Sequence, residues 1–336
     1  MAPPRESRNF GVNEFAHLLG LRFPLIQAGM GGIAGPELAG AVSSAGAGGV
    51  LALYRMREPQ IRPALERTLL LTDRPFGVNL IPELMDCAAL DEQVEAVLDS
   101  TDRNVFFTFY GSPDDAVCER LLRAGRALLI TVGSAAQMKH AQHVGATAVI
   151  LQGTEAGGHL LGSQPLYDLI VEAKDSGCQI PFLGAGGIAS GTDFKRIQAI
   201  GACGCVCGTV FVATSESEAH PFYKQRLVES APEDTVITDI FDIGWRDRRH
   251  RVLHNPLTTD PARPLPRSFI AEIKVLGRSY PIPRYSAMVP TAATRGSVEQ
   301  MAMYCGESVG GVERVVPARD RVNNFIAQFN AAVSTT

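Results

Sequence analysis

Short runs of apolar residues recur along the first two thirds of the chain, and stretches with helical spacing separate them. The eight runs are PLIQAG (24–29), GGVLAL (48–53), FGVNLI (76–81), VFFTFY (105–110), ALLITV (127–132), AVILQG (148–153), PFLGAG (181–186) and CVCGTVF (205–211). Both alternating faces of these runs are apolar, as in parallel strands that are covered on both sides. Eight β-α units in about 220 residues predict an α/β fold of the TIM (β/α)8 type. The alternative is a doubly wound open sheet, which seldom contains eight similar units.

The β-α rhythm ends near residue 221. Residues 221–300 contain helical, turn-rich and proline-rich pieces without another β-α repeat, which predicts a smaller inserted domain that closes over the substrate. Residues 301–336 are typical of a return to the barrel with a closing helix. We therefore predict a barrel over 1–220, a smaller substrate or lid domain over 221–300 and a C-terminal return over 301–336.

Composition and charge exclude several classes of protein. The 336 residues are 46% hydrophobic and 20% charged, enough to bury a large core, and the net charge is −4 without a basic run. This pattern predicts no nucleic-acid or membrane partner and favours a small-molecule substrate. The N-terminus lacks an apolar stretch of signal-peptide length, and no segment has the ~18 uninterrupted apolar residues of a membrane span. Seven cysteines without a CxxC pair indicate free thiols and predict a cytoplasmic protein.

Three of the cysteines, Cys203, Cys205 and Cys207, alternate along the eighth predicted strand. Alternation predicts that all three lie on one face of that strand. Side chains about 7 Å apart along a strand do not converge on one ion, so we interpret them as small buried core residues and expect no metal site.

Glycines gather where the predicted strands end, the place where TIM barrels carry their chemistry. Gly186 and Gly187 follow the seventh strand, and Gly208 and Thr209 follow the eighth. Bare backbone N–H groups at these two turns are typical of a barrel phosphate site. The alternative is that the glycines simply permit tight turns. Two such turns on consecutive strands, with Gly157 and Gly158 after the sixth, favour a phosphorylated cofactor.

His159 directly follows Gly157 and Gly158, in the stretch EAGGHLLG (155–162). The glycines would let a flat ring lie against the backbone while the imidazole faces a substrate. An imidazole titrates near neutral pH, which suits a general base or a hydrogen-bond donor to a developing anion. The alternative is a structural histidine. By contrast, His140 and His143 lie in a predicted helix, and His250 and His254 lie in an arginine-rich stretch that we expect to be solvated.

These residues resemble a known family, the FMN-dependent nitronate monooxygenases, formerly called 2-nitropropane dioxygenases, and their relatives the flavin-dependent enoyl-acyl carrier protein reductases. The resemblance rests on PLIQAGMGGIAGPELAGAVSSAGAGGVL, RPFGVNL, GATAVILQGTEAGGH, GAGGIASG and GACGCVCGTVFVATSESEAHPFYK, with DTVITDIFDIGWRDRRHRVLHN and MAMYCGESVGGV farther on. It covers nearly the whole chain.

The resemblance implies one FMN at the mouth of the barrel and His159 as the catalytic residue at its reactive edge. The residues that it places around the cofactor are Gly29, Met30, Asn79, Gln152, Gly157, Gly158, Gly186, Gly187, Val206, Cys207, Gly208 and Thr209. The sequence departs from the family at Leu160 and Leu161, where a glycine is common, and this predicts a more apolar pocket wall. It also reads GCVCGT where the family often has GVQMGT; the contact is through backbone, so we still expect FMN to bind.

Three functions fit these residues. The first is the oxidation of alkyl nitronates or nitroalkanes with dioxygen, in which His159 deprotonates a neutral nitroalkane or holds the anionic nitronate. The second is an NAD(P)H-dependent reductase of enoyl thioesters or quinones. The third is a barrel that binds a phosphorylated ligand without catalysis. The sequence does not determine the physiological substrate or the oligomeric state.

Overall fold

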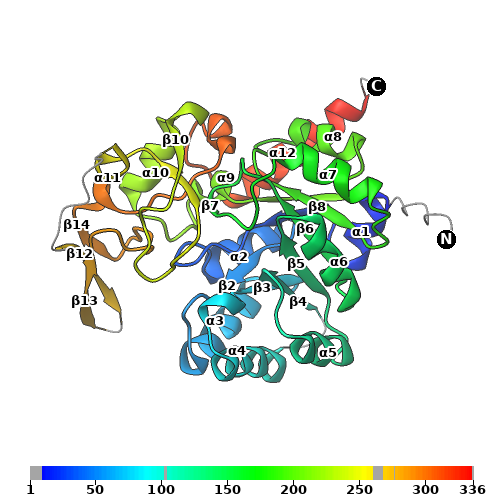
Figure 1. The fold of residues 1–336 in the computed structure, drawn as a ribbon, viewed down its shortest axis with the longest axis horizontal. Coiled ribbons are helices and arrows are strands. Elements are labelled where there is room, and N and C mark those ends of the chain that lie inside the picture. Colours follow the sequence, from blue (N-terminus) through cyan, green and yellow to red (C-terminus); the bar gives the residue numbers. More distant parts are fainter. Residues whose placement is uncertain (1–9, 102–103, 260–267, 276, 335–336) are drawn as a thin grey trace.

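The computed structural model describes residues 10–101, 104–259, 268–275 and 277–334. Eight parallel strands form a nearly closed barrel in the order β1-β9-β8-β6-β5-β4-β3-β2 (Figure 1). They are β1 (Leu25–Gln27), β2 (Val50–Ala52), β3 (Phe76–Leu80), β4 (Val105–Tyr110), β5 (Leu128–Val132), β6 (Ala148–Gln152), β8 (Phe182–Ala185) and β9 (Gly204–Cys207). The predicted TIM barrel and its eight strands are confirmed. The eighth predicted strand is too long, because the short helix α9 (Thr209–Val212) begins within it.

Helices follow the strands and cover the outside of the barrel (Figure 1). They are α2 (Pro36–Ser44), α3 (Glu58–Leu71), α4 (Cys87–Ser100), α5 (Asp115–Arg123), α6 (Ala135–His143), α7 (Leu166–Asp175) and α8 (Gly191–Ala199). Polar residues begin several of them. The Ser134 side chain accepts a hydrogen bond from the Gln137 backbone at the start of α6, and Ser190 caps α8 in the same way.

The barrel closes between β1 and β2, which share one isolated bridge from Ile26 to Gly48. The buried amide of Gln27 completes this junction. Its Oε1 accepts a hydrogen bond from Val50 N at 2.9 Å, and its Nε2 donates to Val50 O at 3.2 Å. A side chain therefore supplies part of the pairing that backbone supplies elsewhere in the sheet.

Successive strand residues alternate between two apolar layers, which explains why both faces of each predicted strand are apolar. Phe106 faces the barrel interior, where the helix α1 (Val12–Leu18) adds Phe15, and Phe107 faces the surrounding helices. Cys205 and Cys207 also face the helices, whereas Cys203 lies in the interior cluster. The prediction that the three cysteines share one face is wrong, because Cys203 precedes β9 and the alternation starts only at Gly204.

Burial raises the pKa of the Cys203 thiol to about 12, so it stays protonated at neutral pH. Within the described ranges no group of three His, Cys, Asp or Glu residues is placed to hold a metal ion. The absence of a metal from this protein stays a prediction.

The chain after α9 builds the smaller part of the molecule (Figure 1, yellow to orange). Its elements are α10 (Pro221–Val228), β10 (Thr235–Thr238), β11 (His250–Leu253), α11 (Pro256–Thr259), β12 (Phe269–Val275), β13 (Arg278–Pro283) and β14 (Thr294–Gly296). They form two antiparallel sheets, β10-β11-β7 and β13-β12-β14. The strand β7 (Gly158–His159) comes from the barrel itself, directly after β6. The sequence did not predict these strands, and the three-segment division stays a prediction.

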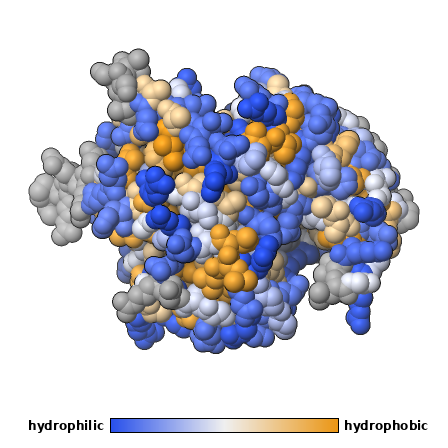
Figure 2. All heavy atoms as spheres, turned by 180° about the vertical axis from the view of Figure 1, so that it is seen from behind, coloured by the Kyte–Doolittle hydropathy of each residue, from blue (hydrophilic) through white to orange (hydrophobic). Residues whose placement is uncertain are grey.

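The final helix α12 (Ala318–Ser334) packs against the barrel helix α8. The Phe329 ring lies 4.9 Å from that of Phe194 in α8 and 5.2 Å from that of Phe23. None of the described helices is long and apolar enough to cross a lipid bilayer. Figure 2 shows one face of the molecule, on which hydrophobic residues form separate patches among hydrophilic ones.

Candidate active site

One large cavity opens at the carboxyl ends of the barrel strands. Its volume is about 680 Å³, within the range of roughly 300–1,000 Å³ that ligand and cofactor sites occupy. The structure brings all thirteen predicted site residues to the wall of this cavity: Gly29, Met30, Asn79, Gln152, Gly157, Gly158, His159, Gly186, Gly187, Val206, Cys207, Gly208 and Thr209. Leu160 and Leu161 are buried but do not line it, so the prediction that they make the pocket wall more apolar is wrong.

The turns after β8 and β9 form one end of the cavity. The backbone N–H groups of Gly187 and Gly208 donate to no described protein atom. A Cβ atom on Gly208 would meet Ala28 Cβ and Met30 Sδ at an ordinary 3.6 Å. Packing within the protein therefore does not require glycine at 208, and a ligand against this backbone would explain it.

Gly157 and Gly158 lack side chains for two different reasons. A Cβ atom on Gly157 would lie 2.5 Å from Gly306 N, so this glycine admits the neighbouring 305–306 backbone. Gly158 has φ +84°, and a Cβ atom there would meet open space. Packing within the protein therefore explains the missing side chain of Gly157, whereas the space at Gly158 is open, and the contact of both glycines with a flat ring stays a prediction.

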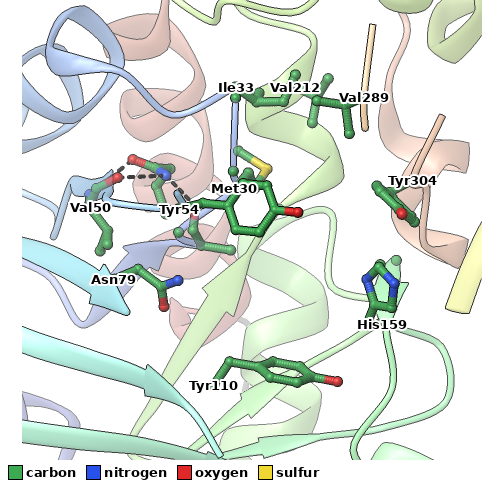
Figure 3. Close-up of a pocket in the computed structure, with 18 of the residues that line it drawn as sticks. Met30, Ile33, Val50, Tyr54, Asn79, Tyr110, His159, Val212, Val289 and Tyr304 are labelled. Atoms are coloured by element: carbon green, nitrogen blue, oxygen red, sulfur yellow. Dashed lines mark hydrogen bonds between the residues drawn. The ribbon is translucent and has the colours of Figure 1, made fainter. Parts of the chain in front are cut away.

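Two amide side chains connect the cavity wall to the barrel. Gln152 Nε2 donates to His159 O at 2.9 Å, and Gln152 Oε1 accepts from Leu161 N at 2.9 Å. Gln152 therefore fixes the backbone from His159 to Leu161. Asn79 Oδ1 accepts from the Thr108 hydroxyl at 2.9 Å, which leaves its Nδ2 group to face the cavity (Figure 3).

His159 lies at the opposite side of the cavity from Asn79 and beside Tyr304, whose ring centroid is 5.1 Å away (Figure 3). The His159 residue is only 5% exposed, and its Nε2 atom is buried without a described hydrogen-bond partner. Burial, followed by the nearby His250 and Arg248, lowers the pKa of His159 to about 2. The imidazole is therefore neutral at physiological pH.

His250, which we expected to be solvated, is fully buried and pairs with His159 across β11 and β7. Its Nε2 accepts from Phe241 N at 3.3 Å, and its Nδ1 lies 3.0 Å from Arg248 O. The prediction is wrong because β11 is a strand whose Val252 and Leu253 are buried. The run TVIT (235–238), in which every residue is β-branched, carried a strand signal that could have indicated a sheet in this segment. His254 is exposed, as expected.

Aromatic side chains that the sequence analysis did not single out complete the wall around His159. Tyr54, Tyr110, Trp245 and Tyr304 all line the cavity. Figure 3 shows Tyr110, His159 and Tyr304 on the same side of the cavity, whereas Trp245 is not labelled there. The hydroxyl oxygen of Tyr110 is buried without a described partner, and burial followed by the Glu83 carboxylate raises its pKa. Tyr110, at the end of β4, and Tyr54, directly after the predicted strand 48–53, could have been found from their places at strand ends.

Residues 13–328 match the family model described as nitronate monooxygenase. This chain belongs to the nitronate monooxygenase family. The predicted family is confirmed. Members are flavin-dependent oxidoreductases, so the predicted class of enzyme is confirmed as well.

Curated members of the wider group differ in the reactions that their names state. The (3aS,4S,5R,7aS)-5-hydroxy-7a-methyl-1-oxo-octahydro-1H-indene-4-carboxyl-CoA dehydrogenase of Mycobacterium tuberculosis is 33% identical over 71% of this chain. The chain spans 65% of the length of that relative and of its Rhodococcus jostii counterpart. A probable nitronate monooxygenase of Bacillus subtilis is 27% identical over 94% of this chain and 98% of its own length.

Two solved structures are similar to this chain over nearly its whole length. FabK from Thermotoga maritima has a TM-score of 0.80 and 26% identity, with 98% of each chain covered. Nitroalkane oxidase from Streptomyces ansochromogenes has a TM-score of 0.76 and 26% identity. The match covers 95% of this chain and 99% of the oxidase chain.

Proposed function

We propose that this protein is an FMN-dependent oxidoreductase that oxidises alkyl nitronates with dioxygen. The observation that carries the proposal is the arrangement of one cavity: two backbone turns with free N–H groups at one end, and the unpartnered Nε2 of His159 at the other. A mononucleotide that spans these ends would place its ring beside the histidine.

The residues present fit FMN. The backbone N–H groups of Gly187 and Gly208 suit a phosphate, and the space at Gly208 that a side chain would fill lies against Met30. Asn79 Nδ2 and the open side of Gly158 suit the edge and face of a flat ring. We propose FMN rather than a dinucleotide because these features describe one phosphate end and one ring end in a single cavity.

When bound, the flavin would accept electrons from the substrate and pass them to dioxygen. The chain itself supplies position and electrostatics. His159 resists protonation, so it is a poor general base for a neutral nitroalkane, but its neutral ring still carries one N–H group that can donate to an anionic oxygen. We therefore propose that His159 holds the nitronate anion. Of the two roles predicted from the sequence, this geometry favours the second.

A second candidate function is the reduction of enoyl thioesters with NAD(P)H. The observation in its favour is that two curated relatives are named as dehydrogenases of a carboxyl-CoA compound. NAD(P)H would then have to enter the same cavity. We place the protein in the cytoplasm because all seven cysteines are free, and we propose a small-molecule substrate and dioxygen as its partners.

We expect the purified protein to consume dioxygen when an alkyl nitronate is added without NAD(P)H. The matched neutral nitroalkane should support a much lower rate, because a histidine with a lowered pKa does not readily remove its proton. An oxygen electrode measures both rates, and chromatography of the flavin released by heat identifies FMN. Dioxygen uptake that requires NAD(P)H would contradict the proposal and favour the second candidate.

A further inference from the structure

The loop between β10 and β11 reaches over His159 and carries Trp245, the single tryptophan of the chain. The indole stacks on the imidazole with ring centroids 3.7 Å apart and an interplanar angle of 14°. It also meets the Tyr110 ring edge to face at 5.2 Å and lies 6.3 Å from the Tyr54 ring. Trp245 is thus the centre of an aromatic group that covers His159 on the cavity side.

A carboxylate of the barrel holds this loop in place. Glu83, which follows β3, accepts a hydrogen bond from Trp245 Nε1 at 2.5 Å. Its second oxygen, Oε2, pairs with Arg248 Nη2 at 2.5 Å, and Arg248 Nε lies 3.1 Å from both oxygens. The Glu83 hydrogen bond, followed by its charge, raises the pKa of Arg248. Bidentate pairs of this kind fix geometry as well as charge.

The ends of the loop are tied down separately. His250 bonds to Phe241 N and to Arg248 O, and so joins the two sides of its base. Arg55 Nη2 donates to Gly244 O at 2.9 Å. Arg55 and Asp247 both have positive φ, at 56° and 58°, a conformation that costs free energy in residues other than glycine. Contacts with the barrel therefore hold the loop in a defined closed position.

While Trp245 stays in this position, the Nε2 atom of His159 is buried and has no partner. Because the indole lies against one face of the imidazole and lines the same cavity, it limits the space beside His159. A small substrate needs a small displacement, whereas a long or branched one needs the space that the indole occupies and the release of its bond to Glu83.

We propose that Trp245 is the specificity-determining residue of this site, a gate that admits small nitronates to His159 and excludes long or branched ones. This inference rests on the proposed function, because it takes the nitronate as the substrate. Trp245 acts on substrate access, and its indole is not required for the removal of electrons from the substrate.

The test compares wild type, Trp245→Ala, Trp245→Phe and Glu83→Gln with a short and a long alkyl nitronate. We expect Trp245→Ala to raise kcat/KM for the long nitronate relative to the short one by about tenfold or more, since each methylene in an apolar pocket contributes about 10-fold or more. Trp245→Phe keeps a ring over His159 and should stay within about threefold of wild type. Glu83→Gln loses the charge pair with Arg248 but keeps an acceptor for the indole, and should lie between the two.

A binding measurement separates the gate from the reaction. Carboxylates share the planar pair of oxygens and the charge of nitronates, and they are not oxidised. Addition of octanoate to the holoprotein should change the emission of Trp245 more than addition of propionate does, because the longer chain displaces the indole. An unchanged selectivity in Trp245→Ala, or tryptophan emission that is indifferent to both bound carboxylates, would overturn the gate. Failure of any nitronate to react with wild type would instead remove the proposed function, and the emission test would still decide the gate.

Discussion

Replacement of His159 by asparagine is expected to slow flavin reduction by an alkyl nitronate by about 10²–10³-fold, the usual effect of removing one donor to a developing or fixed anion. FMN content should remain that of wild type, because the proposed phosphate turns lie at the other end of the cavity. Anaerobic stopped-flow absorbance measures the reduction rate, and the absorbance ratio of flavin to protein measures the content.

His140→Asn, an exposed change on α6, is the matched control and should be without effect. Because burial lowers the pKa of His159 to about 2, the imidazole stays neutral from pH 5 to 8. The rate with a preformed nitronate should therefore show no ionisation from His159 in that interval. A rate that falls as His159 becomes protonated near pH 6.5, or an Asn variant as fast as wild type, would contradict the assigned role.

Replacement of Gly208 by leucine is expected to weaken flavin binding while the protein still folds. The backbone at Gly208 accepts a Cβ atom at ordinary contact distance from Ala28 and Met30, both of which line the cavity. A longer side chain would then enter the space proposed for the phosphate. If this overpacking costs about 1–3 kcal/mol of binding free energy, the dissociation constant of FMN rises about 5- to 150-fold.

Titration of the flavin-free protein with FMN measures this effect, with circular dichroism as the check on folding. Gly11→Leu is the matched control, because a Cβ atom there meets open space outside the cavity. Gly187 is less suitable for such a test, since its φ of +69° makes any side chain strained. Wild-type affinity in a folded Gly208→Leu protein would refute the phosphate assignment.

The barrel could be predicted from the sequence because each strand is a short run of consecutive residues that is buried on both faces. Phe106 and Phe107 are adjacent and both apolar, and the structure shows why: one faces the interior and the other the helices. The glycine-rich strand ends were equally informative, since the carboxyl ends of barrel strands converge wherever the fold forms. Both signals depend on residues close together in the chain.

The rest of the site depends on contacts between distant residues, which local patterns do not carry. Trp245 and Glu83 are far apart in the sequence, and although Glu83 lies two residues after a predicted strand, nothing local indicates that it pairs with Trp245. Gly157 lines the cavity as predicted, but the reason for its missing side chain is the backbone of residue 306, which packs against it. The arginines around His250 in the sequence suggested a solvated segment. In the structure β11 is buried, and His250 pairs with His159.

The most direct measurement of the central claim is anaerobic mixing of the purified protein with an alkyl nitronate in one experiment and with NAD(P)H in another, while the visible absorbance of the flavin is followed. We expect the nitronate to bleach the flavin within the turnover time and NAD(P)H to leave it oxidised. Rapid bleaching by NAD(P)H with no reaction from the nitronate would contradict the claim.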